Sequence, residues 1–221
     1  MDKGYGQSDP RLVRYVEETF GDHDDALLEG IRARAVAAGL PDIHVSPLDG
    51  LHLEVLVRMA GARRAVELGT LAGYSAIRIL RGMGEGGLLH TFEVDARHAA
   101  VAAETFRLAG VEARVRLHIG PALGYLHDIE ADGPFDVVFI DADKVAYPMY
   151  LDWAAKHLRV GGTVIGDNAF LFGKVIDKAE GDEIARIGAM RAFNHALARG
   201  GRFRATMLPT GEGLAVGVKI K

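Results

Sequence analysis

The chain has 221 residues, a formal net charge of -4 and a hydrophobic fraction of 49%, which suits one α/β domain with a single sizeable core. Its Lys and Arg residues are scattered, so no basic field is offered to nucleic acid or to an anionic membrane, and we expect small-molecule partners. The absence of cysteine excludes disulfides and thiolate metal sites. No apolar run approaches the roughly 20 residues of a membrane span, and residues 1–8 lack the apolar core of a signal peptide. We therefore expect a cytoplasmic protein.

Two helices are predicted before residue 45. Residues 9–20 carry apolar side chains at helical spacing and are ended by Gly21. Asp22 to Asp25 offer N-caps for a second helix that runs to about Ala38. This cap of about residues 9–45, part of one domain spanning 1–221, is either a packing layer or a lid or dimer surface. Its apolar faces exceed what one sheet face needs, so we expect a homodimer.

Residues 65–77 predict a strand, a tight loop and a helix, just after a third helix that Ser46 and Pro47 open. An apolar run containing Glu67 leads into a turn bounded by Gly69 and Gly73, and apolar residues then resume at helical spacing. The next apolar run, 88–94, contains Glu93 near its end. In a βαβ unit that spacing brings a carboxylate to ribose hydroxyls, so a nucleoside is the implied ligand.

The glycine pattern distinguishes between nucleosides. Dinucleotide folds use G-x-G-x-x-G, whose second glycine admits a pyrophosphate. Here Leu71 and Ala72 stand where that cradle would need glycine, so a pyrophosphate is disfavoured. A glycine-rich turn after a first strand occurs in many doubly wound proteins. This segment resembles the first motif of S-adenosylmethionine-dependent methyltransferases, whose ligand carries an adenosine without a phosphate.

The rest of the chain alternates helices and strands, which implies a parallel sheet with right-handed crossovers. Strands are predicted at 88–94, 115–119, 135–140 and 163–166, with helices at 73–81, 95–110, 121–129, around 150–158 and near 182–199. The run 135–140 is apolar at every position except Asp136, as in a strand covered on both faces, and should be central. The last two strands, 203–208 and 214–220, are joined by a connection too short for a parallel crossover, so they must form an antiparallel hairpin.

Two acids and an amide follow the fourth and fifth strands. Asp141, Asp167 and Asn168 should face the same crevice as Gly69 and Glu93, because ligands bind at the carboxyl ends of parallel strands. Three oxygen donors suit a hard cation, most plausibly Mg²⁺. The alternative is that Asp141 caps the following helix and that Asp167 and Asn168 form an Asx-type turn.

Lys144 stands three residues beyond the first candidate ligand. A metal cation beside an ammonium disfavours the charged form, so Lys144 could lose its proton near neutral pH and act as a base. The alternative is an ordinary solvated lysine. Nine histidines show no ligand spacing, and we expect His90, His118 and His157 at strand or helix surfaces.

Three motifs together are similar to those of the cation-dependent O-methyltransferases, the group of catechol and caffeoyl-coenzyme A O-methyltransferases. They are VELGTLAGYS, FIDADK and GDN, and the resemblance runs from Ser46 and Pro47 to the final hairpin. It implies a Rossmann-like methyltransferase fold, in the α/β class, with a mainly parallel seven-stranded sheet, an antiparallel hairpin at its end and extra N-terminal helices. It also implies S-adenosylmethionine and Mg²⁺, or another divalent cation, as cofactors.

The matching motifs assign roles to individual residues. By this resemblance Glu67, Gly69 and Ser75 contact the methionine end of the cofactor, Glu93 the ribose and Ala122 the adenine. The metal ligands would be Asp141, Asp167 and Asn168, with Asp141 also counted among the cofactor-binding and catalytic residues. Lys144 would be the general base.

The implied reaction is methyl transfer to one hydroxyl of a vicinal dihydroxy-aromatic, or catechol-type, acceptor. The sequence departs from relatives in two places: His44, Leu51 and His52 stand where relatives have glutamines and an aromatic near the donor site, and Gly211, Glu212 and Gly213 stand where an aspartate is commoner. Phe170, Leu171 and Phe172 either close over the acceptor as a mobile loop or belong to the core. A nicotinamide-dependent oxidoreductase and a non-catalytic S-adenosylmethionine-binding protein remain alternatives.

Overall fold

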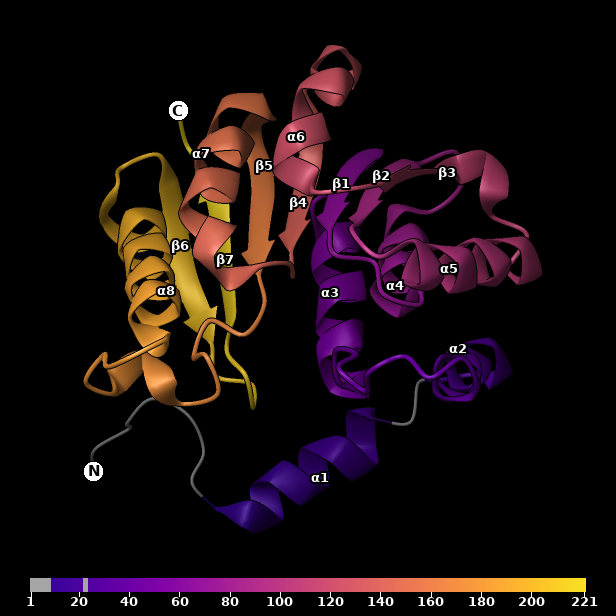
Figure 1. Ribbon diagram of the computed structural model, residues 1–221, viewed down its shortest axis with the longest axis horizontal. Helices are drawn as coiled ribbons and strands as arrows, with labels where there is room; N and C mark the ends of the chain where they lie inside the picture. Colours follow the sequence, from indigo (N-terminus) through magenta and orange to yellow (C-terminus); the bar gives the residue numbers. More distant parts are fainter. Residues whose placement is uncertain (1–8, 22–23) are drawn as a thin grey trace.

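The computed structural model describes residues 9–21 and 24–221, so the segment 1–8 and the cap candidates Asp22 and His23 lie outside the described residues. Figure 1 shows the elements in chain order. The helices are α1 (Pro10–Phe20), α2 (Ala26–Ala37), α3 (Pro47–Met59), α4 (Tyr74–Met83), α5 (Ala96–Leu108), α6 (Ala122–Tyr125), α7 (Tyr147–His157) and α8 (Glu183–Arg199). The strands are β1 (Arg64–Leu68), β2 (Leu88–Glu93), β3 (Val115–Ile119), β4 (Phe135–Ile140), β5 (Leu158–Gly166), β6 (Phe203–Leu208) and β7 (Leu214–Lys219).

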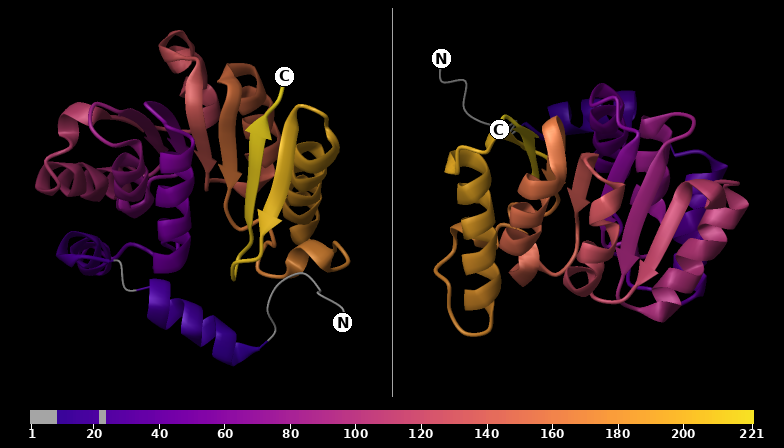
Figure 2. Two further views of the ribbon diagram at one scale, coloured as in Figure 1. Left: turned by 180° about the vertical axis from the view of Figure 1, so that it is seen from behind. Right: turned by 90° about the horizontal axis from the view of Figure 1, so that it is seen from above.

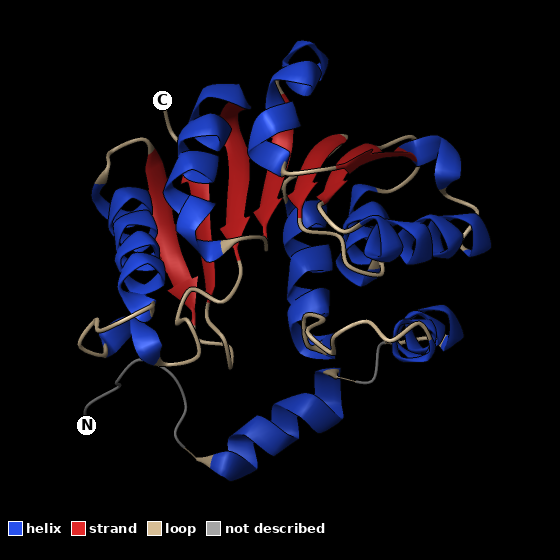
Figure 3. Cartoon of the chain, viewed as in Figure 1, coloured by secondary structure: helices blue, strands red, loops and turns tan. Residues whose placement is uncertain are grey.

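The strands form one sheet in the order β3-β2-β1-β4-β5-β7-β6. The pairs from β3 to β5 are parallel, whereas β7 is antiparallel to both β5 and β6. Figure 3 shows this arrangement, with the terminal hairpin at one edge of the sheet. The predicted fold class, including the central position of 135–140 and the final hairpin, is confirmed.

Helices cover both faces of the sheet (Figure 2), and two cores lie between them and the strands. In β4, Val138 and Ile140 pack in the core that contains residues of α7 and α8. Their neighbours Val137 and Phe139 pack in the other core, with residues of α2, α3 and α4. Side chains alternate across a strand, so a strand buried on both faces needs the unbroken apolar run that the sequence has there.

Local signals explain the helix starts. Asp25, Ser46 and Asp95 are the predicted N-caps, and each accepts a hydrogen bond from a backbone N–H of the first turn, at Leu28, Asp49 and Arg97 respectively. Within the described residues, no helix combines the length and the apolarity that a membrane crossing requires.

Two predicted bounds were wrong. The helix expected at 121–129 is only the short α6 followed by a 3-10 turn over Leu126–Asp132, since Gly124 has a low helix propensity. The fifth strand begins at Leu158 rather than Thr163, because Gly161 and Gly162 form an irregularity within the strand, where the register with β4 shifts, and not a turn before it.

The predicted cap divides into two different helices. Helix α2 is a packing helix whose Leu28, Ile31 and Ala35 are buried. Helix α1 has no buried residue, and it lies at the margin of the molecule in Figure 1. Its apolar side chains Tyr15 and Phe20 are 60% and 51% exposed.

Candidate active site

A cleft of about 870 Å³ lies at the carboxyl ends of the parallel strands. It falls in the size range of small-molecule and cofactor sites. Most of the residues that the sequence singles out line it: Gly69, Ser75, Glu93, Ala122, Asp141, Lys144, Asp167 and Asn168. The fold thus brings together groups that are up to a hundred residues apart in the chain.

The strand ends meet because the hydrogen-bond ladder continues one residue past each strand. The N–H of Asp141 donates to the carbonyl of Leu68 at 2.8 Å, and that of Asp167 donates to Ile140 at 3.0 Å. Gly69 has a φ of +100°, and a Cβ there would lie 2.0 Å from the carbonyl oxygen of Asp141. Only glycine allows this approach, so Gly69 fixes the separation between the ends of β1 and β4.

Glu67 does not line the cleft; it is fully buried behind Ser75. Burial raises the pKa of Glu67 to about 8, although hydrogen bonds from the Ser75 and Thr91 hydroxyls act in the opposite direction. The Thr91 hydroxyl donates to Oε2 of Glu67 at 2.5 Å. In this structure Glu67 therefore supports the loop at the start of α4, and its predicted contact with a methionine end stays a prediction.

Glu93 is held rigidly at the end of β2. Its carboxylate accepts hydrogen bonds from the backbone N–H of Leu71 at 2.8 Å and from that of Asp95 at 2.9 Å. Leu71 belongs to the loop after β1, and Asp95 caps α5. This carboxylate therefore ties the loop after β1 to the end of β2, and it presents a fixed acceptor to the cleft.

Lys144 is not a freely solvated lysine, because its side chain is only 12% exposed. Its Nζ donates to Oδ1 of Asp141 at 2.9 Å and to the hydroxyl of Tyr147 at 2.7 Å. The Tyr147 hydroxyl also contacts the carbonyl oxygens of Ile140 and Asp167 at 3.0 and 3.1 Å. Burial raises the pKa of Tyr147 well above its ordinary value, so the phenol stays neutral. The amine is consequently fixed in one position on the cleft wall.

Sequence reasoning missed Tyr147. A signal was available, since Tyr147 stands three residues after Lys144, where a helical turn brings two side chains to the same face. The motif alone does not reveal that this tyrosine is buried, because its burial depends on packing against Phe193 of α8.

Asp167 is a buried carboxylate that lies near a second negative charge. Burial raises the pKa of Asp167 to about 7, and the charge of Asp141 adds to this effect. Nearby positive charge would stabilise the ionised Asp167 carboxylate against both its burial and the repulsion from Asp141. No group of three or more His, Cys, Asp and Glu side chains suited to a metal occurs in residues 9–21 and 24–221, so the candidate donors are two carboxylates and the Asn168 amide. Such a set of hard oxygen donors fits Mg²⁺ or a similar divalent cation.

Of the two alternative roles predicted for these acids, the helix cap at Asp141 is not found and the Asx-type turn at Asp167 and Asn168 is. The 3-10 turn η3 (Lys144–Ala146) is capped by Asp143, whose carboxylate accepts from the N–H of Val145, and not by Asp141. The Asx-type contact does occur, because Oδ1 of Asp167 accepts from the N–H of Asn168 at 2.7 Å. That bond leaves the second carboxylate oxygen of Asp167 available for another role.

The apolar run after Asn168 is divided between core and cleft. Leu171 is fully buried in the core, and Phe170 packs against Gly213 of the β6–β7 connection. Phe172 is 60% exposed and lines the cleft. Of the three residues expected to cover an acceptor, only Phe172 is in a position to do so.

The surface position expected for His90 was wrong. This residue is 3% exposed, and its Nδ1 lies 3.1 Å from Nε2 of His118, with the two rings stacked. Burial and the neighbouring His118 lower the pKa of His90, so a neutral ring is favoured. Neither ring lines the cleft.

Comparison with known proteins identifies the family. A family model described as O-methyltransferase matches residues 17–220. A catechol O-methyltransferase of Niastella koreensis is 41% identical over 196 residues, which cover 88% of this chain and 87% of that protein. One of Mycobacterium tuberculosis is 41% identical over 184 residues, covering 83% and 82%. The crystal structure of an O-methyltransferase from Bacillus cereus in complex with SAH has a TM-score of 0.86 and 38% identity, covering 95% of this chain and 97% of that chain. The chain belongs to this O-methyltransferase family and is an S-adenosylmethionine-dependent enzyme.

Proposed function

We propose that this enzyme transfers the methyl group of S-adenosylmethionine to one hydroxyl of a catechol-type acceptor, with Lys144 as the general base and a divalent cation held by Asp141, Asp167 and Asn168. The observation that carries the proposal is the fixed Lys144 amine, 2.9 Å from the Asp141 carboxylate in the same cleft as Asp167. The names of the two catechol O-methyltransferases support the acceptor class.

The chain's own residues would share the chemistry as follows. The loop from Gly69 to Ser75 and the Glu93 carboxylate bind the cofactor, and Nζ of Lys144 accepts the proton of the attacking hydroxyl. A new C–O bond forms as the S–CH₃ bond breaks, and the bonding pair stays on sulfur, leaving S-adenosylhomocysteine. When bound, a cation held by Asp141, Asp167 and Asn168 would supply positive charge that favours ionisation of the acceptor hydroxyl, and it would favour acceptors with two adjacent oxygens. An oxyanion and a sulfonium become neutral, so a water-poor cleft favours the transition state.

The test is transfer of labelled methyl groups to a panel of ortho-diphenols and single phenols, with and without a chelator. We expect methylated ortho-diphenols only, and loss of the product when the metal is chelated. Equal activity on single phenols, or activity that survives the chelator, would contradict the proposed acceptor class or the cation. The family match already favours methyl transfer over the oxidoreductase alternative. Binding of S-adenosylhomocysteine without methylation of any phenol on the panel would mean that the acceptor belongs to another chemical class.

Phe172 is proposed to select among acceptors. We expect Phe172→Ala to change the ratio of kcat/KM between bulky and small catechols by about 5- to 30-fold, because an aromatic wall of the cleft is removed. The dissociation constant of S-adenosylhomocysteine, measured by calorimetry, should stay within about twofold, a margin well below the effect of one lost contact. Ile176→Ala is a matched control, because Ile176 is 86% exposed in the same segment and does not line the cleft. Equal losses for every acceptor would mean that Phe172 has no part in selection.

A cytoplasmic location stays a prediction. The second part of the proposal is a homodimer formed through α1. Burial of exposed side chains on α1 against a partner copy would stabilise a dimer. Leu12→Glu with Val16→Glu should weaken self-association by at least about 100-fold, because charge would enter an apolar contact. Arg14→Glu, on the opposite side of the helix, should not. Light scattering at micromolar concentration would show the mass of the 23.7 kDa chain doubled in the wild type and the control. A monomeric wild type would contradict the prediction.

A further inference from the structure

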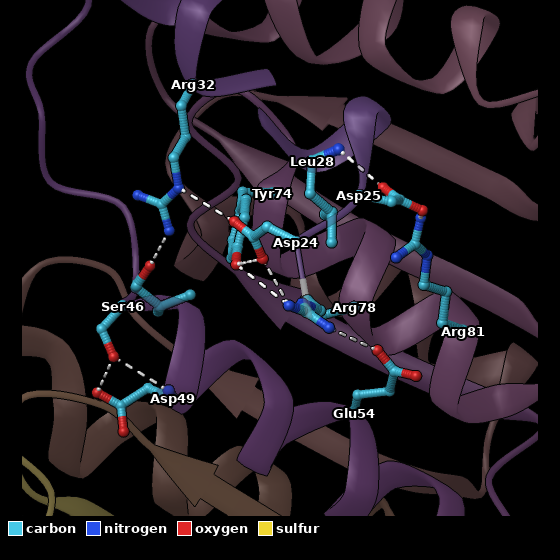
Figure 4. Close-up of polar contacts among 11 residues, drawn as sticks. Asp24, Asp25, Leu28, Arg32, Ser46, Asp49, Glu54, Tyr74, Arg78 and Arg81 are labelled. Carbon is cyan, nitrogen blue, oxygen red and sulfur yellow. Dashed lines mark hydrogen bonds and ion pairs between the residues drawn. The ribbon is translucent and has the colours of Figure 1, made fainter. Parts of the chain in front are cut away.

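Helix α2 contributes no residue to the cleft lining, yet a buried polar cluster connects it to the cleft. We call this set the α2 cluster; it consists of Asp24, Arg32, Glu54, Tyr74 and Arg78. Figure 4 shows that its side chains point toward one another; Asp24 precedes the N-cap of α2, and the others come from α2, α3 and α4. Asp24 accepts from the Tyr74 hydroxyl and from Nη2 of Arg78, both at 2.6 Å, and Nη1 of Arg78 donates to Glu54 at 3.0 Å. The cluster fixes α2 on the start of α4.

Arg32 is the member of the α2 cluster that also contacts the segment before α3. Its Nη2 donates to the carbonyl oxygen of Val45 at 2.7 Å. Its guanidinium carbon lies 4.2 Å from the centre of the Tyr74 ring, and its Nε lies 3.6 Å from Asp24. One side chain on α2 therefore contacts two elements that line the cleft, the segment before α3 and the first turn of α4.

The segment that Arg32 reaches, residues 42–46, is an extended stretch that we call the entrance wall. All five of its residues line the cleft, although none belongs to a helix or strand. Among the described residues, the hydrogen bonds that its backbone makes are local ones, from Ile43 to Pro41 and from Gly50 to Ser46, apart from the one that Arg32 donates. A segment without a ladder depends on such contacts, and here also on the buried Val45 side chain, to keep its shape.

We infer that Arg32 is a positioning residue: through the Val45 carbonyl and the Tyr74 ring it holds the entrance wall in the shape that binds the cofactor and the acceptor. Arg32 does not line the cleft, so it is placed to touch neither ligand and none of the reacting groups. Helix α2 thus takes part in ligand binding from outside the cleft. The effect on the acceptor rests on the proposed function, whereas the effect on S-adenosylhomocysteine rests only on the family.

Arg81 offers a matched control for this inference. Its Nη2 contacts Asp25 at 2.7 Å and so joins α4 to the start of α2, as the α2 cluster does. Figure 4 shows this pair on the far side of the cluster from Ser46. Arg81 does not line the cleft. Arg81→Met therefore removes a bridge between the same two helices without touching the entrance wall.

The experiment measures the melting temperature, the dissociation constant of S-adenosylhomocysteine, the KM of a catechol acceptor and kcat. For Arg32→Met we expect the dissociation constant of S-adenosylhomocysteine and the KM of the acceptor to rise about tenfold, the scale of one lost charge-assisted hydrogen bond. The kcat should stay within about twofold. Arg32→Lys keeps a donor and should restore part of the binding. Arg81→Met should lower the melting temperature while the binding constants stay those of the wild type.

Two results would overturn the inference. One is Arg32→Met with wild-type binding constants, and the other is Arg81→Met with the same binding loss as Arg32→Met, since either would reduce the cluster to a structural bridge. The acceptor class is tested separately. If the wild type methylates no catechol, the proposed function fails, and the S-adenosylhomocysteine constants still decide about Arg32.

Discussion

Replacing Lys144 with methionine is expected to slow methyl transfer by about 10² to 10⁴, the usual contribution of a general base. Methionine has a similar length but cannot accept a proton, so the acceptor hydroxyl keeps its proton when the sulfonium is in reach. S-adenosylmethionine and the divalent cation should still bind, because neither depends on a proton acceptor at this position. Single-turnover rates and calorimetry would separate the two effects. Higher metal concentration should not rescue the rate.

The pH dependence of the Lys144→Met rate then distinguishes a base from a positioning group. If a raised pH restores most of the rate, the acceptor ionises without help and Lys144 only positions it. Near-normal turnover at neutral pH would contradict the assignment altogether. Lys156→Met is a suitable control, because Lys156 is exposed on α7 and does not line the cleft. This control should leave both the rate and the binding unchanged.

Replacing Asp167 with alanine should act on the metal rather than on the proton. One of two carboxylates is removed from the candidate donor set, so we expect Mg²⁺ or Mn²⁺ to bind at least about 10- to 100-fold more weakly, since even residues that only support metal ligands have effects of that size. The methylation rate should fall most at low metal concentration, and added Mg²⁺ should restore part of it. Titration with Mn²⁺ provides the binding constant directly.

Asp177→Ala is the matched control for charge, because Asp177 is exposed in the segment after the site and lies outside the cleft. It should leave metal binding unchanged. The contrast with Lys144→Met is the decisive part, since added metal is expected to rescue the Asp167 variant and not the Lys144 variant. Unchanged metal affinity after loss of Asp167 would show that the cation, if the enzyme uses one, lies elsewhere.

Much of this fold could be predicted because its signals are local. The apolar run from Val137 to Ile140 identified β4 as the central strand, and the short connection from Pro209 to Gly213 required the antiparallel hairpin. The convergence of Asp141 and Asp167 could be predicted too, because the carboxyl ends of parallel strands meet at one edge. These inferences depend on periodicity and on chain length between elements, which the sequence carries directly.

Contacts between distant elements could not be predicted in the same way. The bond from Arg32 to the Val45 carbonyl, and the buried His90 beside His118, depend on how helices and strands pack, and no spacing in the chain encodes them. Tyr147 is similar, since a helical position reveals its face but not its burial. The bounds of β5 were wrong because paired glycines can occur either at a turn or within an irregular strand.

Two kinds of backbone line the cleft, strand ends and irregular segments. Gly69 and Glu93 come from strand ends and their first loops, which the hydrogen-bond ladder of the sheet fixes. Other parts of the lining come from the entrance wall, from Phe172 in the segment after Asn168, and from Glu212 in the hairpin connection. The hairpin connection is tied to the Phe172 segment by a hydrogen bond from the N–H of Phe170 to the carbonyl of Glu212 at 2.9 Å.

Segments of this second kind tolerate insertions and substitutions far better than sheet strands do. Evolution, or an engineer, can therefore exchange residues 170–173 and 209–213 as a pair, while residues 42–46, on which we expect the affinity for S-adenosylhomocysteine to depend, are kept. New acceptor ranges should arise by grafting these two segments together, and grafts of only one of them should fail because each supports the other.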